Sequence, residues 1–302
     1  MNMKSADVLG EELSHLEYLT SLLNERLALI RQETERCQVE EQRLNADTFA
    51  AKKDTRKLAE FFRARGLFVV NLQKGARTID QYALAKQLWR ARAVCLPFIK
   101  ALSKNKEPSF VHDKQALSPT ETTDIKNLCD TLKKHGYLDY EVKPDGYVIK
   151  PSLKGTQKYF LSGAWAEEVT LYLIDKALKK FAQAHSLGHR LFWDVRLKRI
   201  DSDKDNSHDM QLDLVAEVED RFYIFETKSG FVLSIDKWVD RTRLFDDGRN
   251  RFITCTADDK LNPLIFKPFR LFALQTLEEQ FSGMLQEDFL SPADTATGSP
   301  KS

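Results

Sequence analysis

The sequence predicts an α+β protein in three parts: an N-terminal helical region, a helix-and-hairpin segment and a C-terminal α/β domain. Three observations support this prediction. Leucines recur every seven residues near the N-terminus, which is typical of an amphipathic helix that packs along its length. A Pro-Asp-Gly turn joins two short apolar runs in the middle of the chain. Two longer runs rich in β-branched and aromatic residues, at 209–218 and 221–228, form a predicted hairpin.

The composition is that of an ordinary globular protein. Of the 302 residues 42% are hydrophobic and 30% are charged, and the formal net charge is +1. Binding to nucleic acid would therefore depend on local basic patches. The four cysteines are dispersed, which predicts neither a zinc site nor a disulfide framework. Without a signal-peptide pattern or an apolar run of about 18 residues, we expect a cytoplasmic protein that does not span a membrane.

Residues 6–45 have the spacing of heptad repeats. One heptad position holds Leu9, Leu16, Leu23, Ile30, Cys37 and Leu44, and the other holds Leu13, Thr20, Leu27, Thr34 and Glu41. Three interpretations remain open: a helix packed on its own protein, a dimerising coiled coil, or a docking helix for a partner protein. A second, basic helix is predicted for residues 47–64, ending at Gly66. Its charges form either a solvated face or a face that contacts phosphates.

The middle of the chain predicts a helix followed by a hairpin. A helix is expected over residues 78–102 and a loop over 103–119, after which Ser118-Pro119 supplies the start of another helix. That helix places Ile125, Leu128, Cys129 and Leu132 on one face. Short strands at 137–142 and 147–150 flank the Pro-Asp-Gly turn. This arrangement resembles the last helix and wing of a winged helix-turn-helix domain, which would either contact DNA or serve as a structural connector.

The C-terminal part alternates helices and strands. The predicted elements are a helix at 162–184, a strand at 190–200, the hairpin, a helix at 234–245, a strand at 251–256 and a helix at 266–284. The predicted domain boundaries are accordingly 1–66 (helical), 67–152 (winged-helix-like), 153–290 (α/β) and 291–302 (a disordered tail).

The predicted hairpin concentrates charge at one point. Glu226 and Lys228 share a strand face, and antiparallel pairing brings Asp213 beside Glu226. Burying two carboxylates and a lysine among apolar neighbours costs free energy unless a ligand binds there. A divalent cation would offset the repulsion between the carboxylates. The alternative is an exposed ion pair between Glu226 and Lys228, with Asp213 facing solvent.

This pattern resembles the core of the PD-(D/E)XK nuclease superfamily, which has an acid on one strand and Glu-x-Lys on the next. The predicted order of elements is that of the restriction-endonuclease-like fold. The resemblance implies that Asp213, Glu226 and the carbonyl of Thr227 coordinate Mg²⁺ or Mn²⁺. It also implies that Lys228 orients a water or stabilises the transition state. Glu167, with Glu168 as the alternative, would help to hold the metal or its water shell.

Three stretches narrow the resemblance within the superfamily. Gly163-Ala-Trp-Ala-Glu167, Gln211-Leu-Asp213 and Phe225-Glu-Thr-Lys228 are similar to the nuclease domain of CRISPR ancillary nucleases, the Card- and Can-type proteins that carry a cyclic-oligonucleotide (CARF) sensor domain. The similarity covers residues 120–285 and leaves out the N-terminal third, so activation by a cyclic oligonucleotide is not carried over. We also expect Gln211, Lys198 and Arg199 to contact substrate.

The sequence thus predicts a metal-dependent nuclease that acts on DNA, or on RNA, in defence or mobile-element biology. A homodimer or a complex with a partner protein is expected through residues 6–45. The alternative is a non-catalytic nucleic-acid-binding or adaptor protein, in which the winged helix and coiled coil act and the nuclease-like domain is inert.

Overall fold

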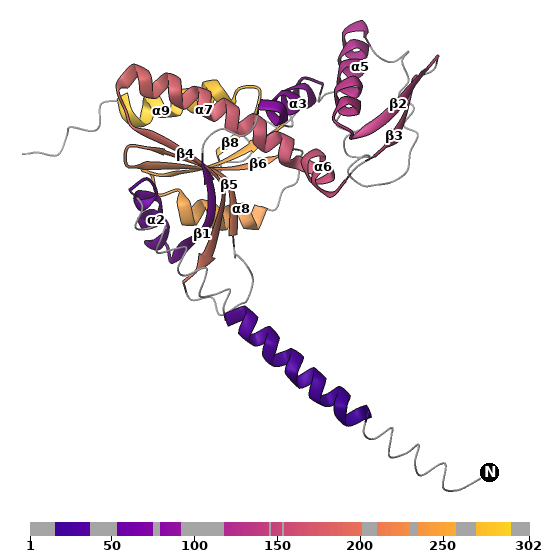
Figure 1. Cartoon of the computed structure of the whole chain (residues 1–302). Coiled ribbons are helices and arrows are strands. Elements are labelled where there is room, and N and C mark those ends of the chain that lie inside the picture. Colours follow the sequence, from indigo (N-terminus) through magenta and orange to yellow (C-terminus); the bar gives the residue numbers. More distant parts are fainter. Residues whose placement is uncertain are drawn as a thin grey trace, which may run out of the picture. The chain divides into compact units, whose positions relative to one another are not determined.

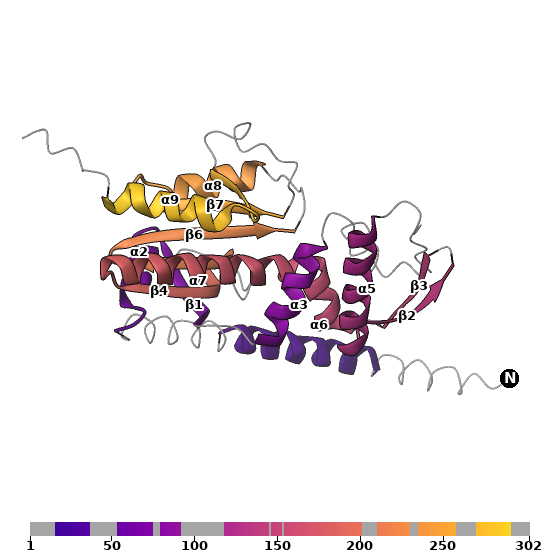
Figure 2. The ribbon, with the colours of Figure 1, turned by 90° about the horizontal axis from the view of Figure 1, so that it is seen from above.

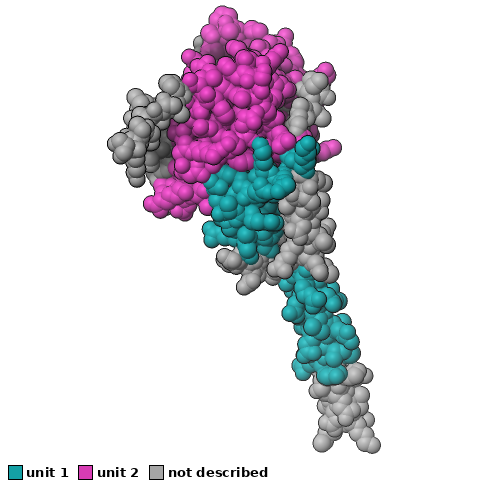
Figure 3. Space-filling model, turned by 90° about the vertical axis from the view of Figure 1, so that its left-hand side faces the viewer, with its two compact units in different colours: residues 1–71, 196–211 teal, residues 72–195, 212–302 magenta. Residues whose placement is uncertain are grey.

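The computed structural model describes residues 16–36, 53–74, 79–91, 118–144, 146–152, 154–200, 210–229, 235–257 and 270–290. These residues form a mixed α/β structure (Figure 1). The larger sheet has six strands in the order β1-β4-β5-β6-β7-β8, and a smaller sheet pairs β2 with β3. The chain divides into two compact units, residues 1–71 with 196–211 and residues 72–195 with 212–302 (Figure 3).

The described residues of the first unit include two helical stretches. Residues 16–36 are helical, as the heptad spacing predicts, and the rest of the predicted helix at 6–45 lies outside the described residues. Helix α2 (Arg56–Arg63) buries an i, i+3, i+4 face of Leu58, Phe61 and Phe62. Gly66 adopts φ +72° after this helix, a left-handed conformation that favours glycine. The apolar run that follows, too short to assign from sequence, begins strand β1 (Leu67–Lys74).

The middle of the chain forms the helix and hairpin that its sequence predicts. Helix α3 (Ile79–Arg90) precedes α5 (Pro119–Lys134), β2 (Leu138–Lys143) and β3 (Gly146–Pro151). A capping box starts α5: Ser118 Oγ accepts from the Glu121 N–H at 3.3 Å, and Glu121 Oε2 accepts from the Ser118 N–H at 2.8 Å. The predicted apolar face of α5 is buried. The two strands pair antiparallel across their turn.

Helix α7 (Trp165–His185) is the longest element of the second unit. It follows α6 (Gly155–Tyr159) and a π-helical turn (Phe160–Ala164), and most of its apolar stripe is buried. Tyr172 is an exception, since it is 40% exposed. Tyr172 lies at the margin of the stripe, where its ring stacks on Tyr82 of α3 with centroids 4.0 Å apart.

Helices cover both faces of the larger sheet at strands β6 to β8. Figures 1 and 2 show α7 beside α9 (Leu277–Leu290) on one face, and Figure 1 shows α8 (Ile235–Phe245) on the other. Strands β4 (His189–Arg199), β5 (Met210–Val218) and β6 (Arg221–Lys228) are followed by β7 (Arg251–Thr256) and β8 (Arg270–Ala273). β5 and β6 pair antiparallel, whereas β6, β7 and β8 run parallel. Among the described helices, none is both long and apolar enough to cross a membrane.

The single helix predicted at 266–284 is wrong for the part of it that the structure describes. Residues 270–273 form strand β8 instead, and α9 begins only at Leu277. Leu271 and Ala273 are both buried and lie two residues apart, as in a strand that turns one face to the core. Pairing with β7 satisfies the backbone of this short segment, an option that the local sequence does not reveal.

Phe281 on α9 provides a test of this packing. Its ring lies edge-on to Tyr223 and Phe225 of β6, with centroids 5.3 and 5.2 Å away. We expect Phe281→Ala to lower the free energy of unfolding by about 3–5 kcal/mol, since it leaves a cavity in the core. Urea denaturation would measure the loss, with exposed Tyr159→Ala expected to change stability by about 0.5 kcal/mol or less. A loss at Phe281 as small as that at Tyr159 would contradict the packing.

Candidate functional site

The hairpin of β5 and β6 sets the position of the candidate site. Leu214 pairs with Phe225, so the same antiparallel register sets Asp213 opposite Glu226. The Thr227 N–H donates to Asp213 Oδ2 at 2.6 Å, which holds the carboxylate at the end of the ladder. The predicted meeting of Asp213 with the Glu-x-Lys strand is therefore confirmed.

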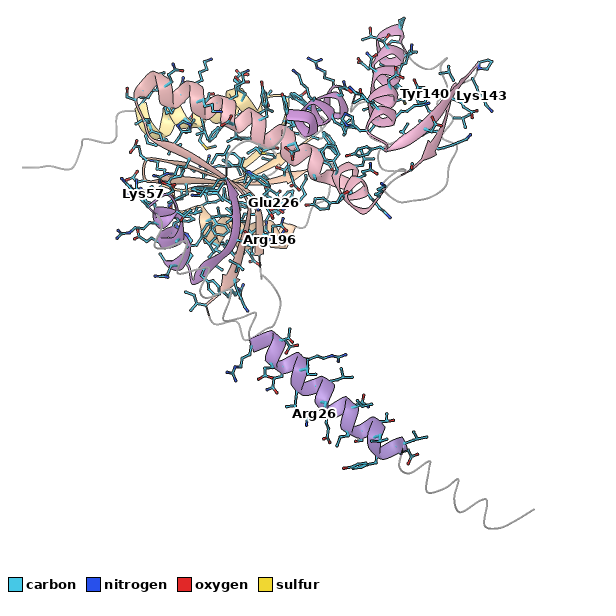
Figure 4. All side chains as sticks on the ribbon, viewed as in Figure 1. Arg26, Lys57, Tyr140, Lys143, Arg196 and Glu226 are labelled. Carbon is cyan, nitrogen blue, oxygen red and sulfur yellow. The ribbon has the colours of Figure 1, made fainter. Side chains whose placement is uncertain are left out.

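Four side chains form a charged group, which we call the carboxylate cluster: Asp213, Glu226, Lys228 and Arg241. Lys228 Nζ lies 2.7 Å from Glu226 Oε1, and Arg241 Nη1 of α8 forms an ion pair with Glu226 Oε2. Glu226 is only 3% exposed and Arg241 6%, whereas the Lys228 side chain is 30% exposed. Figure 4 shows Glu226 within the sheet. A buried carboxylate thus has a cation at each oxygen.

Asp213 is less well compensated than Glu226. Burial raises the pKa of Asp213 to about 6, and the neighbouring charge of Glu226 adds to the rise. The Thr227 N–H, Lys228 and Arg241 act in the opposite direction without cancelling it. Because both cations contact Glu226, the neighbouring Asp213 has less positive charge close to its carboxylate than Glu226 has.

The chemistry of these donors fits a hard divalent cation. Carboxylate and carbonyl oxygens are the ligands that Mg²⁺ and Mn²⁺ prefer, and the raised pKa of Asp213 marks a place where added positive charge is favourable. In the part of the chain that the structure describes, no three His, Cys, Asp or Glu side chains form a group that could hold a metal. The fit therefore depends on the pair Asp213 and Glu226 together with backbone oxygen.

The two glutamates predicted upstream lie in the first turn of α7, with Glu168 buried and Glu167 half-buried. This helix packs on the opposite face of β6, where Thr227 Oγ1 donates to Thr170 Oγ1 at 3.2 Å. Ser229 Oγ donates to the Ser162 carbonyl at 3.2 Å, so the π-helical turn before α7 contacts the end of β6. The structure does not bring Glu167 into one metal-holding group with the pair, and its role at the metal stays a prediction.

The three predicted substrate contacts belong to the other compact unit. Lys198 and Arg199 end β4, and Gln211 lies near the start of β5. Lys198 is buried, Gln211 is half-buried and Arg199 is exposed. Of the two basic side chains, Arg199 is therefore the one that presents its charge to solvent.

Arg241 is a site residue that was not predicted from the sequence. Its position indicates burial, because Arg241 lies three residues after Trp238 and four before Phe245, both of which are buried. That spacing places it on the inward stripe of α8, where an arginine needs a partner of opposite charge. Glu226 is that partner.

Comparison with known proteins gives fold likenesses and no family. No family model matches the chain, and no curated protein matches it. Similar solved structures include protein VC1899 from Vibrio cholerae, with a TM-score of 0.49 and 15% identity. Another is Can2 from Sulfobacillus thermosulfidooxidans in complex with cyclic tetra-adenylate, with a TM-score of 0.49 and 13% identity. The alignments cover 76% and 74% of this chain but only 60% of each of those chains.

The raised pKa of Asp213 predicts a pH-dependent stability. An unfolded aspartate has a pKa near 3.9, so between about pH 4 and 6 the folded protein binds more protons than the unfolded chain. Stability from this residue therefore falls as pH rises through that window and is level above it. Asp213→Asn removes the unfavourable energy of ionising this carboxyl in the folded protein. It should therefore raise the free energy of unfolding at pH 8 by about 1–3 kcal/mol.

Urea denaturation in EDTA from pH 4 to pH 8 would measure this effect. The gain from Asp213→Asn should shrink towards zero at pH 4, where the wild-type carboxyl is protonated. Asp175→Asn, which alters a half-buried partner of Lys179 on α7, serves as the matched control. If the increase in the free energy of unfolding does not vary with pH, the pKa of Asp213 is not raised in the folded protein.

Proposed function

We propose that the chain is a metal-dependent nuclease that hydrolyses phosphodiester bonds of DNA or of RNA. The carboxylate cluster is the observation that carries this proposal. Asp213, Glu226 and Lys228 meet at one point of a buried sheet, and a carboxyl group there has a raised pKa. Such perturbed groups collect at functional sites, since a fold gains nothing from crowding carboxylates. The sequence resemblance to the PD-(D/E)XK superfamily points to the same chemistry.

Each residue of the cluster has a role in this proposal. Asp213 and Glu226, with the carbonyl of Thr227, would hold Mg²⁺ or Mn²⁺ as oxygen ligands. When bound, the cation would lower the pKa of a water molecule and offset negative charge on the phosphate. Lys228, whose ammonium lies on the partly exposed side of the cluster, would donate to the attacking water or to the charged phosphoryl oxygens. Glu167 is assigned to the metal or its water shell.

Cleavage assays test the proposal directly. Purified protein with Mn²⁺ or Mg²⁺ should degrade labelled DNA or RNA, in single- or double-stranded form. Asp213→Ala and Lys228→Ala should each lower the rate by about 10²–10³-fold, because each removes a group that acts on the reacting phosphate. Lys179→Ala on α7, an exposed lysine in an ion pair with Asp175, should leave the rate unchanged.

The same assays separate the nuclease from a non-catalytic protein. Circular dichroism would establish that the variants remain folded. Nucleic-acid binding without cleavage under either metal, unaffected by both substitutions, would replace the nuclease with a binding protein.

We also propose that the helix at residues 16–36 is a surface for self-association. Leu16, Leu23 and Ile30 recur every seven residues and are each about 60% exposed, at 62, 63 and 60%. Side chains project from this helix along its described length, as Figure 4 shows around Arg26. A seven-residue apolar repeat suits pairing with an identical helix, and burial in a pair would remove these apolar side chains from water.

Light scattering would measure the oligomeric state. Full-length protein should have twice the mass of one chain, and Leu23→Asp combined with Ile30→Asp should give the mass of one chain, because the charges cannot enter an apolar seam. Glu25→Gln on the same helix is a control that should not change the mass. A wild-type protein of single-chain mass would reject self-association through this helix.

A further inference from the structure

Two stacked tyrosines lie where α3 packs against α7, as Figure 2 shows for the two helices. The rings of Tyr82 and Tyr172 have centroids 4.0 Å apart and planes inclined by 22°. Tyr172 is 40% exposed and Tyr82 is half-buried. Thr170 of α7 contacts β6, and Tyr172, two residues further on, turns away from the sheet. Because each ring holds the other in place, a third ring can join the stack with little loss of side-chain entropy.

Each of these tyrosines begins a row of basic side chains on its own helix. The basic residues follow the tyrosine at four and eight positions, and residues four apart lie on one face of a helix. The rows are Tyr82, Lys86 and Arg90 on α3 and Tyr172, Lys176 and Lys180 on α7. Lys86 is half-buried and the other three cations are exposed. We call these six residues the stacked-tyrosine surface.

Most of the positive charge on this surface is not neutralised by a carboxylate. Lys176 Nζ lies 2.7 Å from Glu278 Oε2 of α9. Among the residues that the structure describes, Lys86, Arg90 and Lys180 have no ion-pair partner. The chain as a whole has a net charge of only +1, so this is the kind of local basic patch on which binding to nucleic acid would depend.

Aromatic rings beside cations fit single-stranded nucleic acid. Unpaired bases stack on aromatic side chains, while lysine and arginine contact the phosphates between them. In a duplex the faces of the bases are covered by their neighbours, so a duplex would contact the cations alone. An acidic peptide would likewise leave the rings unused. The combination of a ring stack with two basic rows therefore favours a single strand over either of these ligands.

We propose that the stacked-tyrosine surface binds single-stranded nucleic acid. One base stacks on the exposed ring of Tyr172, and the phosphates on either side of that base contact the basic rows. Strands of DNA and of RNA share this chemistry. The inference goes beyond the proposed cleavage reaction, because binding here needs neither a divalent cation nor the carboxylate cluster.

Fluorescence anisotropy with the full-length protein in EDTA tests this binding without cleavage. The probes are a labelled oligo-dT DNA strand, an oligo-U RNA strand and a DNA duplex, each 20 nucleotides or base pairs long. The strand with the higher affinity should bind at least about tenfold more tightly than the duplex, because only a strand can stack on the rings. The DNA and RNA probes show which sugar is preferred. Binding of both strands no tighter than that of the duplex would overturn the proposal.

Substitutions at the stack assign the binding to the rings. Tyr172→Ala should weaken binding of the preferred strand by at least about fivefold, because it removes a stacking partner for one base. Tyr172→Phe keeps the ring and should stay within about twofold of the wild type. Tyr159→Ala, at another exposed tyrosine of the same unit, is the matched control and should bind as the wild type does. Unchanged binding by folded Tyr172→Ala would show that the stack is structural only.

Salt dependence tests the basic rows. Arg90→Gln combined with Lys180→Gln should reduce the slope of log Kd against log salt by about 1.4, since each phosphate contact on a single strand accounts for about 0.7. The matched control is Lys133→Gln with Lys150→Gln, which alters two exposed lysines paired with Asp139 and Glu141. A slope that changes only in this control would assign the binding to the winged-helix-like hairpin and overturn the proposal.

Photo-cross-linking provides a readout on the wild-type protein. A strand that contains 5-iodouracil, irradiated in the complex, should form an adduct on Tyr172 or Tyr82 that peptide mass spectrometry locates. Adducts on other peptides alone would contradict the inference. A protein that cleaves nucleic acid but fails these tests keeps the proposed function and loses this surface, whereas one that binds strands through the tyrosines and cleaves nothing shows the reverse.

Discussion

The antiparallel register of β5 and β6 is the constraint on which the candidate site depends. Adjacent residues of β6 face opposite sides, so Phe225 and Thr227 turn towards α9 and α7 while Glu226 turns towards α8. A slip of one residue would exchange these faces and place a carboxylate against Phe281. Burying an aromatic ring contributes about 1.5–3 kcal/mol, so the apolar face enforces the register that sets Asp213 opposite Glu226. Packing on one side of the sheet thereby positions the charges on the other.

The division of the sheet into two differently covered faces has a chemical consequence. On one face, α7 and α9 build the apolar core, and their contacts with β6 are rings and hydroxyls. On the other face, α8 brings a single buried guanidinium to Glu226. Glu226 can be buried because that guanidinium and Lys228 share its charge. Asp213, which accepts from the Thr227 N–H, is the carboxylate of the pair with the raised pKa.

The proposed pairing of helix 16–36 is a separate property, because its exposed leucines belong to the other compact unit.

The sequence alone determined much of the local structure. The Ser118 cap, the apolar face of α5, the β5–β6 hairpin and the meeting of Asp213 with Glu226 all follow from short-range patterns, because helix caps and strand alternation are local properties. Tertiary structure decided the rest. Residues 270–273 became a strand because β7 offered a pairing edge, and Tyr172 found a stacking partner because α3 lies beside it. Arg241 reached Glu226 only because α8 crosses that face of the sheet, a contact between residues 15 positions apart that no local periodicity specifies.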